Sequence, residues 1–337
     1  MPQDPKNPVW YTWPLPHLRP DAPFVNLPLI DENNKLFYWF KTEPQKFINL
    51  QVVSLIRDLY FSKKKQLIED AHLPCLEFFV QKNQLFRSFE FLHHLESTLE
   101  NLWISMAKID YFHQNSNLID KTFIIGFFYT EMEYIFINAR RFFDALQTGI
   151  SQLFTNTCWP ASKGELQKVR KLPLSFSGMY EMDSYRKIKN VKNTYNIPSF
   201  LKSFYEKHEN AFFFVRTLRD MMIHEGKKLD YIFHIPSKGF GISIDGTKNP
   251  MLTLIKAQNI LDERKFENNN IAPALPILAY CLRCSIETAN DFTHLLEQLK
   301  IQLPQDVAPG YHVYFRSPYS KYYNVLETII SENIWAF

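Results

Sequence analysis

The stretch that decides the fold is SFLKSFYEKHENAFFFVRTLRDMMIHEG, residues 199–226. Its apolar residues recur every three or four positions and so mark one face of a helix: Leu201, Phe204, Ala211, Val215, Leu218 and Met222. Pro198 closes the preceding segment, and Gly226 is the kind of residue at which a helix stops. The sequence therefore predicts a long amphipathic helix from Ser199 to about Glu225.

The same periodicity predicts three further long helices. They span about 84–114, 118–154 and 272–301, and each carries one apolar stripe. Four long helices that each bury one stripe favour packing against one another as an antiparallel bundle. We therefore expect a mainly α fold whose body is a four-helix bundle.

A hairpin and a basic loop interrupt this body. Residues 230–235 and 240–244 are apolar segments on either side of a Pro-Ser-Lys-Gly turn, which predicts a small β-hairpin insertion within 230–246. Residues 156–197 lose the helical period and are interrupted by prolines and glycines. This loop connects the second and third long helices.

Both ends of the chain are expected to extend the body. The first 45 residues hold many prolines and predict extended chain with one short strand at 35–40, and short helical patterns follow at 45–61 and 65–70. The last residues predict a short apolar segment at 311–315 and a closing helix near 319–334. The sequence thus divides into an N-terminal extension, a helical body and a tail: 1–82, 83–302 and 303–337.

Composition narrows the class of protein. Hydrophobic residues make up 46% of the chain, enough for a sizeable core, and the net charge of +3 names no partner. Nine glycines against twenty prolines argue against a glycine-rich nucleotide fold. The N-terminus has no apolar signal-peptide core, and the apolar run 123–130 is too short to span a bilayer. We expect a cytoplasmic protein with no membrane partner.

The four cysteines give no complete metal site. Cys281 and Cys284 have the spacing of half a zinc site, but neither Cys75 nor Cys158 has a partner at ligand spacing. We expect Cys281 and Cys284 to fill the core, and we expect no metal and no cofactor.

The candidate catalytic residues lie at the end of the helix predicted from Ser199 to about Glu225. They are Arg219, Asp220 and His224. Arginine holds a phosphate through a planar fork of donors, and histidine transfers protons near neutral pH. Asp220 lies one helical turn before His224, so the two can touch. The bare spacing of arginine and histidine also occurs at Arg87 and His93, but there no acid follows the arginine.

This arrangement resembles the HEPN superfamily, whose motif is an arginine, usually a polar residue, and then a histidine late in a long helix of a four-helix bundle. The resemblance covers the motif and the helical body, roughly residues 84–302, and Glu225-Gly226 also reads like common members. It does not cover the first eighty residues or the tail. The fold class it implies is a HEPN-like antiparallel four-helix bundle with a β-hairpin insertion and two extensions.

The resemblance also implies an activity. Active HEPN proteins are metal-independent endoribonucleases, usually homodimers with two motifs facing one cleft, and many are toxins or phage-defence effectors. Carried over, Arg219 would hold the scissile phosphate, His224 would be the general base or acid, and Asp220 would orient the histidine or hold Arg219. RNA, a second copy of the chain and an antitoxin or regulatory protein are the implied partners.

The basic loop is the best candidate for further RNA contacts. The expected phosphate-binding residues are Arg186, Lys187, Lys189 and Lys192, together with Lys227 and Lys228 just after the motif. Tyr180, Tyr185 and Tyr195 are interleaved and could stack on bases. The alternative is an ordinary solvated loop.

A non-catalytic alternative stays open for the whole chain. A histidine is favoured at a helix C-terminus by the dipole and the free carbonyls, and Asp220 could pair with Arg216 one turn earlier. On the second helix, Glu131 could line a site, but a plain ion pair is the favoured explanation. The chain would then be a helical protein-interaction or RNA-binding module, either an inactive HEPN or an unrelated bundle.

Overall fold

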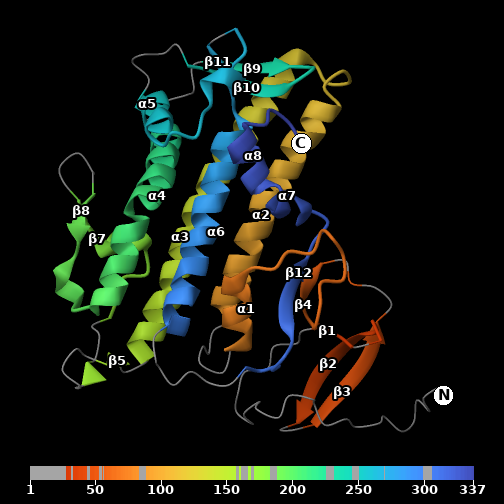
Figure 1. The fold of residues 1–337 in the computed structure, drawn as a ribbon, viewed down its shortest axis with the longest axis vertical. Helices are drawn as coiled ribbons and strands as arrows, with labels where there is room; N and C mark the ends of the chain where they lie inside the picture. Colours follow the sequence, from red (N-terminus) through yellow and green to blue (C-terminus); the bar gives the residue numbers. More distant parts are fainter. Residues whose placement is uncertain are drawn as a thin grey trace. The chain divides into compact units, whose positions relative to one another are not determined.

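The fold is known from a computed structural model (Figure 1). It describes residues 28–31, 33–43, 46–52, 55, 57–82, 89–156, 159–160, 166–167, 171–182, 188–224, 231–244, 250–268, 270–298 and 306–337. Helices dominate these residues and small sheets accompany them, so the mainly α expectation is confirmed.

The helices and strands follow one another along the chain as named here. The helices are α1 Pro74–Gln81, α2 Phe89–Gln114, α3 Lys121–Asn156, α4 Ser199–Ile223, α5 Pro250–Ala257, α6 Leu275–Gln298, α7 Lys321–Asn324 and α8 Leu326–Glu332, with the short 3-10 helices η1 Phe176–Met179, η2 Asn193–Tyr195 and η3 Glu263–Lys265. The strands are β1 Pro28–Ile30, β2 Leu36–Glu43, β3 Lys46–Val52, β4 Asp58–Ser62, β5 Trp159–Pro160, β6 Leu166–Gln167, β7 Tyr180–Met182, β8 Ile188–Val191, β9 Ile232–Ile235, β10 Gly239–Ser243, β11 Ile271–Pro273 and β12 His312–Arg316.

The chain forms two compact units. Unit 1 contains residues 1–96 and 292–321, and unit 2 contains residues 97–291 and 322–337. The boundaries between them fall within α2, α6 and α7. The sequence-based division at residues 82 and 302 did not join the two segments of unit 1.

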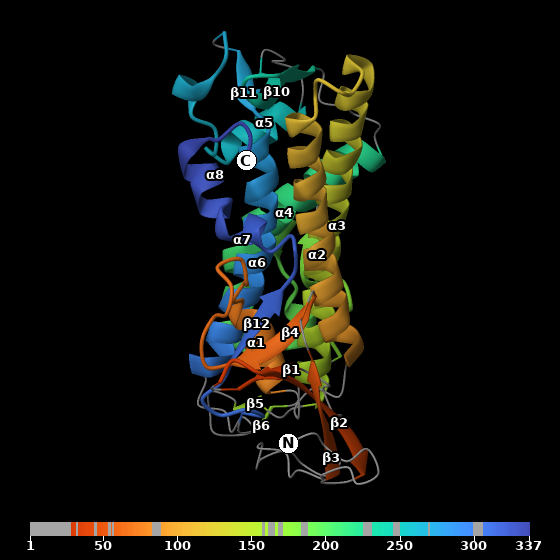
Figure 2. The same ribbon diagram turned by 90° about the vertical axis from the view of Figure 1, so that its right-hand side faces the viewer.

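Unit 2 is built on the long helices that the periodicity predicts, each within a few residues of its expected bounds. Helix α3 packs against α4. Helix α2 lies beside α3 (Figure 2), and an ion pair joins the two helices. Aromatic rings fill the interface between α3 and α4, where Phe143 and Phe176 both meet Phe212 at centroid distances of 5.4 and 5.0 Å. Apolar burial of this kind is what stabilises a helix of ordinary propensity.

The predicted hairpin is present and gains a third strand. Strands β9 and β10 pair antiparallel, and β11 pairs with the other edge of β10. The sheet is fixed to the helices by Phe240, whose ring stacks on Phe128 of α3 at 4.3 Å.

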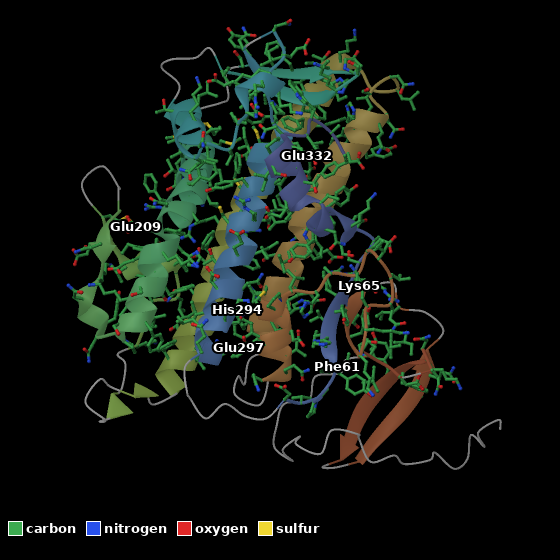
Figure 3. The ribbon with its side chains drawn as sticks, in the orientation of Figure 1. Phe61, Lys65, Glu209, His294, Glu297 and Glu332 are labelled. Atoms are coloured by element: carbon green, nitrogen blue, oxygen red, sulfur yellow. The ribbon has the colours of Figure 1, made fainter. Side chains whose placement is uncertain are left out.

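Unit 1 contains a five-stranded sheet in the order β12-β4-β1-β2-β3. Strands β1 and β4 are parallel, and the other pairs are antiparallel. Phe61 of β4 is buried in this unit (Figure 3). The strand order brings residues from both ends of the chain together, because β12 lies beside β4.

The helical patterns predicted at 45–61 and 65–70 are wrong. The first segment forms β3 and most of β4, and the second is turn and bend. The apolar residues Ile48, Leu50 and Val52 also alternate with period two, and pairing of β3 with β2 decides between the two patterns. Among the residues of the N-terminal extension that the structure describes, the regular elements are therefore strands β1 to β4 and the short helix α1, and the predicted strand at 35–40 matches β2.

The tail agrees with its prediction. The apolar segment is strand β12, and the closing helix is present as α7 and α8. None of the helices within the described ranges is both long and apolar enough to cross a bilayer.

Candidate functional site

Helix α4 positions the predicted catalytic residues. Leu218 and Met222 are buried, which turns the adjoining positions 219 and 220 toward the flank of the helix. Arg219 and Asp220 keep 32% and 19% of their side-chain surface exposed. His224 follows the last helical residue, is exposed, and donates its backbone N–H to the Asp220 carbonyl at 2.9 Å. The three residues therefore share one edge of a helix end.

Arg219 is the centre of this group. Its Nη1 lies 2.7 Å from Asp220 Oδ1 and 2.9 Å from His224 Nε2. A guanidinium can only donate, so Nε2 accepts, and the neutral imidazole carries its proton on Nδ1. The arrangement places a phosphate-binding cation in contact with an imidazole lone pair.

Asp220 contacts arginines on both sides. Its Oδ2 lies 3.4 Å from Nε of Arg216, one turn earlier, and Arg216 Nη1 contacts the Met182 sulfur of β7 at 3.2 Å. Of the two roles expected for Asp220, the side-chain contacts fit the one that holds Arg219. The pairing with Arg216 is also present, so the cluster carries two cations and one anion.

Arg216 and Met182 are the parts of this cluster that the motif did not name. Arg216 is 15% exposed and contacts Asp220 Oδ2, whereas Arg219 contacts Oδ1. Its spacing from Asp220 was the available signal, because residues four apart on a helix are neighbours. The contact with Met182 comes from packing of β7 and β8 beside α4, which no local pattern encodes.

Most of the predicted RNA-binding residues lie outside the part of the chain that the structure describes. Arg186, Lys187, Lys227 and Lys228 lie outside the described residues. The backbone of Lys189 belongs to β8, but its side chain is not described, and Lys192 is partly exposed just before η2. These assignments stay predictions.

Tyr180 corrects one expectation for the basic loop. Its ring is buried against Phe212 at 5.7 Å, and its hydroxyl donates to the Tyr205 carbonyl at 2.9 Å. Burial raises the pKa of this phenol well above its ordinary value. A ring enclosed in this way cannot stack on a base. Tyr195 is half-buried and donates to the Gly178 carbonyl, whereas Tyr185 lies outside the described residues.

The other polar residues considered from the sequence are structural. Glu131 of α3 pairs with Lys108 of α2 at 2.9 Å, as the ion-pair explanation expects. Cys281 and Cys284 are buried in α6, and burial raises the pKa of the Cys284 thiol to about 12. Protonated buried thiols fill space rather than react. Cys158 lies outside the described residues.

Within the described ranges, side chains spaced as metal ligands gather at His72, Glu77 and His312 of unit 1, and not beside Arg219. Comparison with known proteins finds no match for the chain among family models, curated proteins or solved structures. The resemblance to HEPN proteins therefore rests on the motif and the helical body alone.

Proposed function

We propose that the protein is a metal-independent endoribonuclease of HEPN type. The observation that carries the proposal is the contact of the Arg219 guanidinium with the His224 imidazole at a solvent-accessible helix end. An arginine hydrogen-bonded to a histidine supplies both a phosphate-binding fork and a proton acceptor, which few other pairs of side chains do.

The chemistry follows from these two groups. A phosphodiester oxygen binds Arg219, which turns toward the phosphate while Asp220 keeps hold of the guanidinium. Nε2 of His224 is then released and accepts the proton of the ribose 2′-hydroxyl. The 2′ oxygen attacks phosphorus, the bond to the 5′ oxygen breaks, and a proton from water or from the histidine of a second protomer neutralises the leaving oxygen. The products are a 2′,3′-cyclic phosphate and a 5′-hydroxyl.

The proposal includes the partners that the family resemblance implies. Two chains form a homodimer with both motifs at one cleft, RNA enters that cleft, and lysines near the motif hold flanking phosphates. The role is that of a cytoplasmic toxin or phage-defence effector, restrained by an antitoxin or regulatory protein.

A non-catalytic helical module is the second candidate, and one observation favours it. Arg216, Asp220 and Arg219 already form a connected ion-pair network, which can stabilise the end of α4 without any substrate. In that case the cluster is a helix end, and the protein binds a partner protein or RNA without cutting.

The deciding experiment is cleavage of a mixed RNA pool by the purified full chain in EDTA. We expect wild type to cut and to leave cyclic-phosphate ends, and we expect no cutting where the 2′-hydroxyl is absent. Arg219→Ala and His224→Ala should each lower the rate by about 10²–10⁴, the range for losing a charge-stabilising group or a general base. Asp220→Asn should lower it less.

Matched controls separate chemistry from general damage. Arg264→Ala removes an exposed arginine that also pairs with a neighbouring aspartate, and His294→Ala removes an exposed histidine that also pairs with an acid. Both should cut like wild type. Cleavage that survives in Arg219→Ala and His224→Ala would refute the proposal. RNA or protein binding without any cleavage would favour the non-catalytic module.

A further inference from the structure

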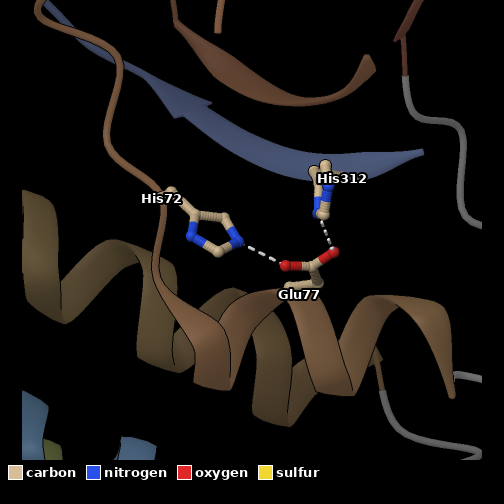
Figure 4. A group of neighbouring side chains, drawn as sticks. All are labelled: His72, Glu77 and His312. Atoms are coloured by element: carbon tan, nitrogen blue, oxygen red, sulfur yellow. Dashed lines mark hydrogen bonds and ion pairs between the residues drawn. The ribbon is translucent and has the colours of Figure 1, made fainter. Parts of the chain in front are cut away.

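Three side chains from distant parts of the sequence converge in unit 1. His72 lies two residues before the start of α1, Glu77 lies in the first turn of α1, and His312 begins β12 (Figure 4). One ligand atom from each lies within 4.8 Å of the other two. The set is two imidazoles and one carboxylate, and each imidazole is directed at one oxygen of the carboxylate.

The carboxylate lies between the two histidines. His72 Nε2 hydrogen-bonds to Oε2 of Glu77, and His312 Nδ1 lies 3.0 Å from Oε1. Burial alone would raise the pKa of Glu77, yet the contacts with His72 and His312 hold it below its ordinary value. Each oxygen of the carboxylate therefore faces one imidazole nitrogen, which gathers the three side chains at one place.

The backbone that carries these residues is fixed by the sheet. Ala71 exchanges two backbone hydrogen bonds with Phe315, at 2.9 and 2.8 Å, and β12 pairs along its whole length with β4. Leu73 is the N-cap of α1 and Pro74 is its first residue, so the start of the helix fixes the short segment between His72 and Glu77. The ring of Tyr314 packs 5.7 Å from that of His72 and 6.3 Å from that of His312. The ligand set is thus preorganised by elements already present for the fold.

Its chemistry matches one class of ion. Imidazole nitrogen with a single carboxylate oxygen suits zinc and neighbouring divalent metals, whereas calcium and magnesium prefer oxygen alone. Metal–ligand bonds of about 2.0–2.2 Å place the ligand atoms of a tetrahedral ion roughly 3.3 Å apart. Small side-chain rotations therefore bring the three atoms onto one ion.

Exposure indicates the kind of site. The side chains of His72 and His312 are 41% and 55% exposed, whereas Glu77 is 21% exposed. The histidines therefore face solvent and the carboxylate forms the floor. Three protein ligands with a solvent side leave the fourth position to water, unlike a structural site closed by four protein ligands.

We propose that His72, Glu77 and His312 bind a divalent transition-metal ion of the zinc type, with its remaining position open to water or an exogenous ligand. The ion joins the start of α1 to β12 and so ties together segments that are 235 residues apart in the sequence. The proposal uses residues of unit 1 only and is independent of the ribonuclease proposal, whose residues lie in unit 2.

The test is metal binding by the full chain after chelator treatment and removal of the chelator. Titration with Zn²⁺ should show one saturable site by calorimetry, and Co²⁺ should give the visible absorption of a low-coordinate nitrogen- and oxygen-bound ion. Zn²⁺ should also raise the melting temperature, because it binds the folded chain.

The variants identify the ligands. His312→Ala and Glu77→Gln should each weaken Zn²⁺ binding at least tenfold, and His72→Ala provides a third variant if either of these folds poorly by circular dichroism. His294→Ala is the matched control, because His294 also pairs with a glutamate, Glu297 at 3.3 Å (Figure 3), but no third metal-ligating side chain joins them among the residues that the structure describes. Wild type that binds no Zn²⁺, or folded His72→Ala and His312→Ala variants that bind it like wild type, would overturn the proposal and leave a hydrogen-bonded triad.

Discussion

Two histidines of the α4 region show how environment sets the chemistry of a residue. His208 is buried. Its Nδ1 lies 3.1 Å from the Thr288 hydroxyl, and its Nε2 lies 3.0 Å from the Asp291 carboxylate. His224, the C-cap residue of α4, is exposed and contacts Arg219. Only the second can meet a substrate. Sequence identified His224 by its neighbours. His208 stands between Phe204 and Ala211 at the spacing of the buried stripe, so the helical period placed it inside, but no partner for it could be read from the sequence.

His208 should make the protein less stable in acid. Burial lowers the pKa of His208 to about 4, against about 6.5 in an unfolded chain. Between these values the unfolded chain binds a proton that the folded chain does not, so the free energy of unfolding falls as the pH drops from about 6.5 to about 4. The total loss from this group is roughly 3 kcal/mol.

Urea denaturation of wild type and His208→Gln at several pH values measures this effect. The variant should be less stable than wild type at pH 7.5, and the difference should shrink toward pH 4, since glutamine does not titrate. His294→Gln, at an exposed position, should follow wild type throughout. A constant gap between His208→Gln and wild type across this range would show that His208 is not a titrating buried group.

At the scale of elements, helices were more predictable than strands. A long amphipathic helix carries its own signal in the spacing of its apolar residues, as in α4 and α6. Strand β3 carries both a helical and an alternating pattern, and only its pairing with β2 decides between them. On α3, Phe128 is buried whereas its apolar neighbour Phe127 is exposed, so an apolar residue type alone does not mark the buried face.

The β9–β10 hairpin depends on one glycine. Gly239 has a φ of +138°, and a Cβ there would lie 2.2 Å from the Trp335 carbonyl oxygen. Gly239→Ala should therefore lower the free energy of unfolding by roughly 2 kcal/mol or more, through both backbone strain and the clash. Chemical denaturation followed by circular dichroism measures the change.

Gly126 supplies the matched control within a helix. It lies in α3, and a Cβ there meets nothing within 4 Å. Gly126→Ala should stabilise the protein by about 0.5–1 kcal/mol, the helix preference for alanine over glycine. If both alanine variants changed stability equally, the constraint at Gly239 would be disproved.

At the scale of the whole molecule, the chain contributes alternately to its two units. Unit 1 takes both its first residues and residues 292–321, and unit 2 takes the central part and the last residues. The Arg219 cluster is local in sequence and could be predicted. The site at His72, Glu77 and His312 could not, because it exists only once β12 pairs with β4.

A buried ion pair between Arg316 and Asp70 stabilises the pairing of β12 with β4. Arg316 donates two hydrogen bonds to Asp70, at 2.9 and 2.8 Å, and Tyr60 donates a third at 2.5 Å. Burial alone would raise the pKa of Asp70, but the bonds from Arg316 and Tyr60 bring it below its ordinary value. Asp70 is therefore charged and almost fully buried in the folded chain.

Arg316→Met should destabilise the protein by about 3–5 kcal/mol, because it keeps most of the volume and leaves the Asp70 carboxylate unpaired. The deficit should narrow in acid, since Asp70 contributes its stability above the unfolded pKa of about 4 and loses it as the pH falls further. Urea midpoints at pH 7 and at a pH well below 4 test both statements. Arg264→Met, in an exposed pair with Asp262, should leave the midpoint unchanged; an equal effect of the two variants would refute a special role for the buried pair.

The strand order also governs how the protein is made. Asp70 and Arg316 are 246 residues apart, so a ribosome adding about 5–20 residues per second needs roughly 12–50 s to deliver the arginine after the aspartate. Throughout that interval one edge of β4 has no strand beside it in the nascent chain, and an open edge invites pairing with other chains. Translation speed and chaperone protection of residues 58–62 should therefore influence yield more than the stability of the finished protein does.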